Sequence, residues 1–556
     1  GDFEIARSAN IFLDHSSITV GDSGSIIVLA DASLEMEKQS VLRVTDGGSI
    51  SFADDTVLIS LRESIAEVSG GGNILFSDKT IAILKDLAQF YVSGGGSILF
   101  ELDSSAELSD SSLLAVEGGG SIVFSDATHL RVTESALRVL GGNILFSGFG
   151  DIIIEDSSSL EVNGGNIEYH GERVVQLLAS SLFIQAGDLQ TFDNTIFDMK
   201  TSSTASITGG NFILSDKSLI TMETASMSIS GGNVELYHSG IVQMSSASMS
   251  VSAETPGISF GNFVAHNQVQ VFLEKKSLLS VSGGNFMTED SSSVSLLTSD
   301  VSVSSGSILS SGQSTFHVEE SSVDVSGGNL SLSGTSIWSV TVDSKASISG
   351  GDVDLLDDSI MDLLDSSLSV SDGNFHMNDL SQFQLESSVL SVTGGQIKYT
   401  EDSSFTATIG NIAVTCGQIF HEGNSLFDVV QTQISVNKNC DSNPLARFIS
   451  SPDDLLLVAG TSKFSSSQQT VIDLIDGDFS FAENSSSFII DTIINISGGN
   501  MNFFGSSSHN LAGVSISVSA GSMQLSDSSS VSLSETSEIS ISGGNLFVRG
   551  NAQFNM

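Results

Sequence analysis

The sequence is poor in proline and in basic residues, and each shortage excludes a class of structure or partner. Only 3 prolines occur in 556 residues, as expected if nearly every backbone amide donates to a strand ladder. Against 66 acidic residues there are 19 lysines and arginines, for a formal net charge of −47. Such a surface repels nucleic acid and anionic membranes, so we expect neither as a partner.

Long apolar runs and helical periodicity are also missing. No run of 18 apolar residues occurs, so we expect no membrane insertion in this segment. No stretch keeps an apolar period of 3.6 residues, and Gly, Ser and Val dominate, so helices are not expected. No signal peptide is visible and the chain begins at Gly1 without Met. We therefore expect a mature or trimmed piece, which continues into a larger protein or docks its ends onto other subunits.

Cysteine is scarce as well. The two cysteines, Cys416 and Cys440, are separated by about one period of the repeat described below. This spacing predicts a disulfide between neighbouring coils, which would indicate an oxidising compartment. Two buried free thiols remain the alternative.

What the chain does contain is a repeat. Every 22 to 24 residues it returns to two or three glycines, then Asn or Ser, then an apolar residue, as in Gly70–Ile74 and Gly209–Phe212. A fixed period of this size over the whole length predicts a solenoid. With 40% hydrophobic residues the chain can build a continuous core, so we predict one continuous β-solenoid over residues 1–556.

The apolar positions inside one period predict its strands. After Gly210, apolar residues fall at Phe212, Leu214, Ile220, Met222, Met227 and Ile229, and the same offsets recur after Gly306 and Gly373. Three pairs with a spacing of two predict three short strands per coil, with one set of side chains inward. We predict an all-β parallel β-helix of about two dozen coils.

Equivalent positions in such a fold stack on one another. Phe52, Phe76, Phe100, Phe124 and Phe146 share one position in consecutive coils, which predicts an aromatic stack in the core. The Asn that follows the glycines predicts an amide ladder, with each side chain bonded to the next.

The repeat is irregular in two places, near residues 252–265 and 417–477. The first contains Pro256-Gly257, and the second contains Cys440, Pro444 and Pro452. We interpret both as inserted or irregular segments. Insertions in solenoids form surface loops that often carry binding, so a special site is most expected here.

Acidic residues are the main candidates for chemistry. The candidate acid pairs are Asp54-Asp55, Asp357-Asp358 and Asp453-Asp454, but neighbours on a strand point to opposite faces, so such a pair converges only at a turn. The densest acidic stretch, residues 352–365, lacks a nearby base. We therefore predict no catalytic residue, no cofactor and no enzymatic activity. The densest acidic stretch holds weak calcium candidates, for which a solvated acidic face is the alternative. They are Asp352, Asp354, Asp357 and Asp358.

The coil length, the three strands and the Gly-Gly-[Asn/Ser]-Ile-x-Phe phrase resemble right-handed parallel β-helix proteins of the pectin-lyase-like superfamily. Within it the chain is most similar to polymorphic outer-membrane protein and autotransporter adhesin passengers, which repeat a Gly-Gly-Ala-Ile phrase. The companion Phe-x-x-Asn motif of that family is not regular here. The resemblance implies right-handed coiling and an extracellular or cell-surface location.

The functional hypothesis is a non-enzymatic, extracellular structural or adhesive β-solenoid, such as a filament subunit, a stalk or a surface adhesin. Its expected partners are copies of itself, other extracellular proteins or glycans. The alternative is a polysaccharide-binding or polysaccharide-processing β-helix, such as a tailspike or a pectate-lyase-like protein. A cleft lined by aromatic and paired acidic residues would favour that alternative.

Overall fold

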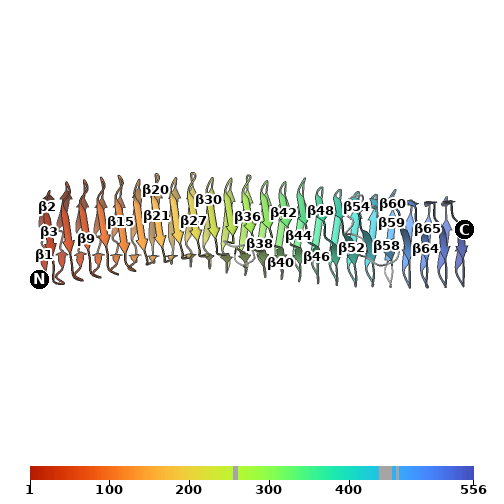
Figure 1. Ribbon diagram of the computed structural model, residues 1–556, viewed down its shortest axis with the longest axis horizontal. Coiled ribbons are helices and arrows are strands. Elements are labelled where there is room, and N and C mark those ends of the chain that lie inside the picture. The colour runs from red at the N-terminus through yellow and green to blue at the C-terminus, as the bar shows by residue number, and fades with distance from the viewer. Residues whose placement is uncertain (254–260, 438–453, 459–462) are drawn as a thin grey trace. The chain divides into compact units, whose positions relative to one another are not determined.

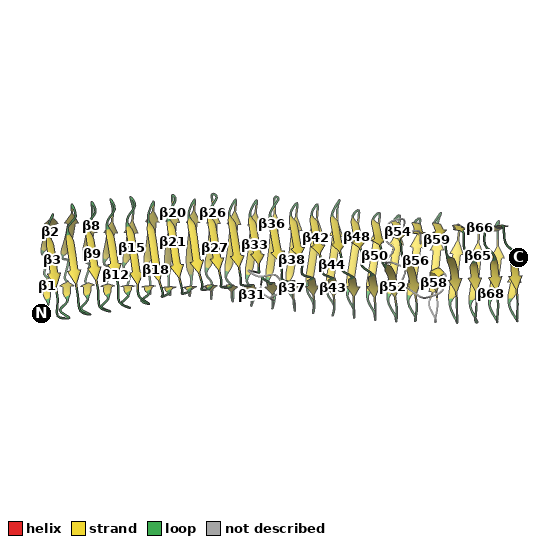
Figure 2. Cartoon of the chain, viewed as in Figure 1, coloured by secondary structure: helices red, strands yellow, loops and turns green. Residues whose placement is uncertain are grey.

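The computed structural model describes residues 1–253, 261–437, 454–458 and 463–556. Within these ranges every regular element is a β-strand, and none is a helix (Figure 2). The chain divides into two compact units, Gly1–Gly284 and Asn285–Met556. Each unit is a parallel β-solenoid with three strands per coil, so the predicted fold class is confirmed.

The first unit runs from β1 (Phe3–Ile5) to β36 (Leu278–Ser282), which makes twelve coils of three strands. Inside this unit, strands three apart in the sequence pair in parallel, as β10 (Ile74–Phe76) does with β7 (Ile50–Phe52) and β13 (Ile98–Phe100), so three sheets form (Figure 1). We call them sheets A, B and C; they begin with β1, β2 (Asn10–Asp14) and β3 (Ser17–Val20). Because the chain has few prolines, nearly every residue has a backbone N–H. Parallel pairing between coils gives these N–H groups their acceptors.

The second unit repeats this arrangement. Its sheets A, B and C begin with β37 (Phe286–Thr288), β38 (Ser293–Leu297) and β39 (Asp300–Ser304), and its last strand is β71 (Gln553–Asn555). The 71 strands in the described residues correspond to about 23 full coils, close to the two dozen expected. The strand register also reproduces the period, because Ile74 lies opposite Ile98 early in the chain and Phe212 lies opposite Val234 later.

The core follows from the alternation along each strand. In β29 (Leu219–Glu223), Ile220 and Met222 are buried, and Thr221 between them faces outward. The same alternation places apolar side chains inside nearly every coil. Since each strand is short, the core of one coil is small, and its stability comes from the coils stacked on both sides.

An aromatic stack runs through the core of the first unit, as predicted. Neighbouring rings lie nearly parallel, with centroids 5.1 Å apart for Phe52–Phe76, 4.6 Å for Phe76–Phe100 and 4.7 Å for Phe100–Phe124. The stack continues through Phe146 to Tyr169. Each such pair adds about 0.5–1.5 kcal/mol beyond the burial of its area.

The two irregular segments fall partly outside the described residues. β33 (Ser248–Ser252) and β34 (Phe263–Ala265) flank the first segment and continue sheets C and A. In the second segment, β55 (Gln418–His421), β56 (Leu426–Val430) and β57 (Gln433–Asn437) form an ordinary coil. The inserted residues themselves, among them Cys440 and the three prolines, lie outside the description, so their arrangement stays a prediction.

Candidate functional site

The glycine corner is where successive coils come closest. A Cβ placed on Gly210 would lie 1.8 Å from the carbonyl oxygen of Gly187, one coil earlier, and a Cβ on Gly96 would meet Gly72 O at the same distance. No side chain fits in that space, so this position must be glycine. The preceding Gly209 has a φ of +72°, a left-handed conformation that glycine adopts without steric cost. The repeated Gly-Gly phrase is therefore a packing requirement.

The Asn after the glycines forms a ladder, but not of the predicted kind. The Oδ1 atom of Asn73 accepts a hydrogen bond from the backbone N–H of Ser97 at 2.8 Å, and Asn211 Oδ1 accepts from the N–H of Asn233 at 2.9 Å. We predicted side-chain amides bonded to each other; instead the donor is the next coil's backbone. The reason is that this N–H lies just before the short strand of sheet A, and the side chain supplies its acceptor.

The predicted calcium candidates lie in the second unit, around β46 (Val353–Leu355). Asp352 occupies the Asn position of the ladder, and its Oδ1 accepts from the backbone N–H of Asn374 at 2.6 Å. Asp354 Oδ1 lies 3.2 Å from His376 Nδ1, and Asp357 Oδ2 accepts from the N–H of Gly334 at 2.8 Å.

Asp354 Oδ2 also accepts from Asn329 Nδ2 at 3.5 Å. The acidic side chains therefore contact different neighbours, and Asp358 is exposed at the corner. In the part of the chain that the structure describes, no group of three or more His, Cys, Asp or Glu is arranged to hold a metal ion. Calcium binding at Asp352, Asp354, Asp357 and Asp358 remains a prediction.

Arg173, at the start of β23 (Arg173–Leu178), is a buried cation that the sequence analysis missed. It is 1% exposed. Its guanidinium donates to the carbonyl oxygens of Asp126 at 3.1 Å, Thr128 at 3.3 Å and Ser147. Burial lowers the pKa of Arg173 to about 10, so it stays charged at neutral pH. The sequence did carry a signal for this burial. Arg173 occupies a position of the repeat at which other coils carry the buried residues Thr128 and Thr195.

Two histidines are also buried in the second unit. His421 is fully buried beside the ring of Tyr399, and its Nε2 lies 2.8 Å from the carbonyl oxygen of Ser425. His509 packs on Phe481, and its Nδ1 lies 2.8 Å from Ser487 Oγ. Burial lowers the pKa of His421 to about 4 and that of His509 to about 3. Both are neutral members of the core at neutral pH.

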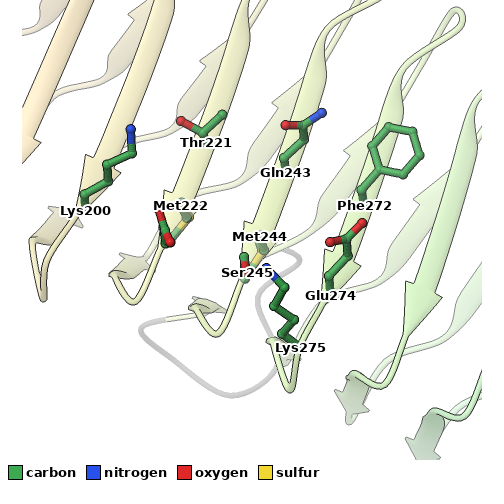
Figure 3. A pocket seen from close by; sticks show the side chains of 10 residues that line it. Lys200, Thr221, Met222, Gln243, Met244, Ser245, Phe272, Glu274 and Lys275 are labelled. Carbon is green, nitrogen blue, oxygen red and sulfur yellow. The ribbon is translucent and has the colours of Figure 1, made fainter.

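A groove of about 510 Å³ lies on the outer face of sheet B in the first unit (Figure 3). It is formed by four consecutive strands of that sheet, β26 (Ile196–Lys200), β29, β32 (Ile241–Ser245) and β35 (Gln270–Glu274). The central outward residues of these strands lie in register across the groove, in the order Asp198, Thr221, Gln243 and Phe272.

One edge of the groove is held by an ion pair. Lys200 Nζ lies 2.6 Å from Asp198 Oδ2, and this contact raises the pKa of Lys200. Asp198 is 6% exposed and also accepts from the hydroxyl of Thr221. Sequence analysis did not predict this groove. The signal was Phe272, an aromatic residue at an outward position between the buried Val271 and Leu273.

Only one of the two cysteines of the predicted disulfide lies in the described residues. Cys416 lies in the corner before β55 with a φ of +61°. The described part of the chain contains no free cysteine. Since Cys440 lies outside the described residues, the pairing of Cys416 with Cys440 stays a prediction.

The fold places this chain in the class of parallel β-solenoid repeat proteins with three strands per coil. Across the described residues, no helix has the length and apolarity needed to cross a membrane. Comparison with protein-family models finds no match for this chain, and neither does comparison with the curated proteins. The argument for function therefore depends on the surfaces of the coils.

Proposed function

We propose that this protein is a non-enzymatic structural or adhesive β-solenoid that acts outside the cell, as a filament subunit, a stalk or a surface adhesin. The observation that carries the proposal is the repetition of the outer surface from coil to coil. β30 (Ser226–Ser230) exposes the hydroxyls of three serines on sheet C, and β33 exposes the same three positions as serines one coil later. A repeated surface suits extended or multivalent contact with a partner.

Charge supports the same proposal. Several basic side chains in the first unit are paired with an acid on the neighbouring coil, as in Arg131–Glu155 at 2.6 Å and Arg43–Glu67 at 2.8 Å. Most of the 66 acidic residues therefore have no basic residue to pair with. The excess negative charge keeps a sheet-rich surface soluble and opposes edge-to-edge aggregation.

Immunolabelling tests the location. Antibodies raised against the purified chain are expected to label intact, non-permeabilised source cells, or the material that these cells shed. Labelling that appears only after permeabilisation would overturn the extracellular role.

Electron microscopy of the purified native protein tests the form of assembly. Fibres with a regular axial repeat would establish the filament subunit. Isolated particles that adhere to surfaces would establish the stalk or adhesin instead. Turnover of a polysaccharide by the purified chain would contradict the non-enzymatic proposal.

A further inference from the structure

The outer groove on sheet B combines an exposed aromatic face with polar side chains. Phe272 is half-buried, and its ring is seen face-on beside Gln243 in Figure 3. The face of an aromatic ring carries partial negative charge, and the axial C–H groups of a pyranose ring carry partial positive charge. A ring that lies flat on a sheet therefore offers a platform for a sugar.

Hydrogen-bonding groups surround this platform. Gln243 lies directly opposite Phe272 on the neighbouring strand, about 4.8 Å away along the coil axis. Its exposed amide can both donate to and accept from a sugar hydroxyl. Ser245 and Glu274 lie opposite each other in the next outward column and supply a hydroxyl and a carboxylate. A volume of about 510 Å³ is in the range of small-ligand sites.

The charges of the groove nearly cancel. Lys200 is paired with Asp198, and the lining also contains one further lysine, Lys275, and two glutamates, Glu223 and Glu274. On a chain with a net charge of −47, such a groove favours an uncharged ligand over an anionic one such as a uronic acid.

We infer that the outer groove on sheet B binds a neutral oligosaccharide, with one pyranose ring stacked on Phe272 and its hydroxyls bonded by Gln243. This inference deepens the adhesive form of the proposed function, on which it rests, because it assigns a glycan as the partner and places the contact. If no sugar binds, the structural role in the proposed function is unaffected. Failure of this inference can therefore be told apart from failure of the proposed function.

The test uses the full chain on immobilised neutral gluco-, manno- and galacto-oligosaccharides, with uronic-acid oligosaccharides as the acidic arm. The best neutral probe is then titrated calorimetrically. Phe272→Ala and Gln243→Ala are expected to weaken its binding about tenfold or more, and Phe272→Tyr is expected to retain it. Thermal melting of each variant confirms that the fold is intact.

Phe488→Ala is the matched control. Phe488 also occupies a central outward position of sheet B, between Ser465 and Asn510, and is 56% exposed. Its replacement is expected to leave binding unchanged. The inference is overturned if no neutral probe binds, if only the acidic probes bind, or if Phe488→Ala weakens binding as much as Phe272→Ala.

Discussion

Gly150 and Arg173 lie opposite each other on neighbouring coils, and both come close to the carbonyl oxygen of Thr128. A Cβ on Gly150 would lie 1.9 Å from Thr128 O and 3.4 Å from Nη1 of Arg173. The guanidinium of Arg173 donates to this carbonyl oxygen, which belongs to the coil two earlier. One side chain thus joins three successive coils.

Replacing Arg173 with Met should destabilise these coils. The substitution keeps most of the apolar stem but leaves several buried carbonyl oxygens without a donor, at an expected cost of about 3 kcal/mol. Because a repeat array does not unfold in a single step, hydrogen exchange of the amides in β17 (His129–Thr133) to β23 is the appropriate measurement. Arg131→Met, which removes an exposed ion pair, should cost less than about 1 kcal/mol. Equal losses for both variants would contradict the structural role of Arg173.

At the glycine corner, replacing either of two adjacent glycines with alanine should give very different losses of stability. Gly210→Ala places a methyl group 1.8 Å from Gly187 O, so the two backbones must separate, and we expect a loss above about 3 kcal/mol. Gly209→Ala meets nothing closer than 3.6 Å and costs only the left-handed conformation, about 1 kcal/mol. Thermal melting of the two variants compares them. A similar midpoint for both would show that the corner tolerates a wider spacing.

The residue after the glycines needs a side-chain oxygen that accepts from the next coil's backbone N–H. We expect the NH₂ of its side-chain amide to be dispensable. Asn211→Ala should cost about 1 kcal/mol, since the N–H of Asn233 loses its acceptor. Asn211→Ser should recover most of that loss, because Ser49 fills the same role for the N–H of Asn73. Exchange of the Asn233 amide proton reports the effect directly. If Ser gives no recovery, the contribution of Asn211 comes from packing.

Acid should destabilise the second unit through its buried histidines. The pKa values of His421 and His509 are lowered to about 4 and about 3, whereas a free histidine titrates near 6.5. Between these values the unfolded chain binds more protons than the folded chain. Each histidine's contribution is therefore complete above about pH 6.5 and falls by up to about 1.4 kcal/mol per pH unit toward the lower pKa.

A His421→Phe, His509→Phe double variant should melt with a flatter dependence on pH between about 6.5 and 4.5 than the parent chain. Parallel curves for parent and double variant would contradict the assignment.

The predicted calcium site at the acidic stretch competes with its alternative, a solvated acidic face. Because Asp352, Asp354 and Asp357 contact different neighbours, the structure favours the solvated face, on which calcium would act only through the general negative charge. The test compares the parent chain with one triple variant, Asp354→Asn, Asp357→Asn, Asp358→Asn. Calcium should raise the melting temperature of both by the same amount, relative to sodium at equal ionic strength. Loss of the calcium effect in this variant would establish the site that the acidic stretch predicts.

Much of the fold could be predicted because it depends on local patterns. The period-two pairs after Gly210 predicted the strands, and the recurrence of Phe52 and Phe76 predicted the aromatic stack, since a solenoid places residues one period apart in contact. The candidate sites were less predictable. The groove requires Gln243 to lie opposite Phe272, and the intervening insertion hides that register from the sequence.

The sequence by itself determined the solenoid, its three strands per coil and its acidic surface, because these follow from periodicity and composition. Only the tertiary structure decided what individual side chains do. Arg173 can be buried because carbonyl oxygens of the two preceding coils accept hydrogen bonds from its guanidinium. Asp352 is a ladder residue because the N–H of Asn374 lies above it. Such roles depend on contacts between coils, which are set by the stacking of about one period of chain on the next.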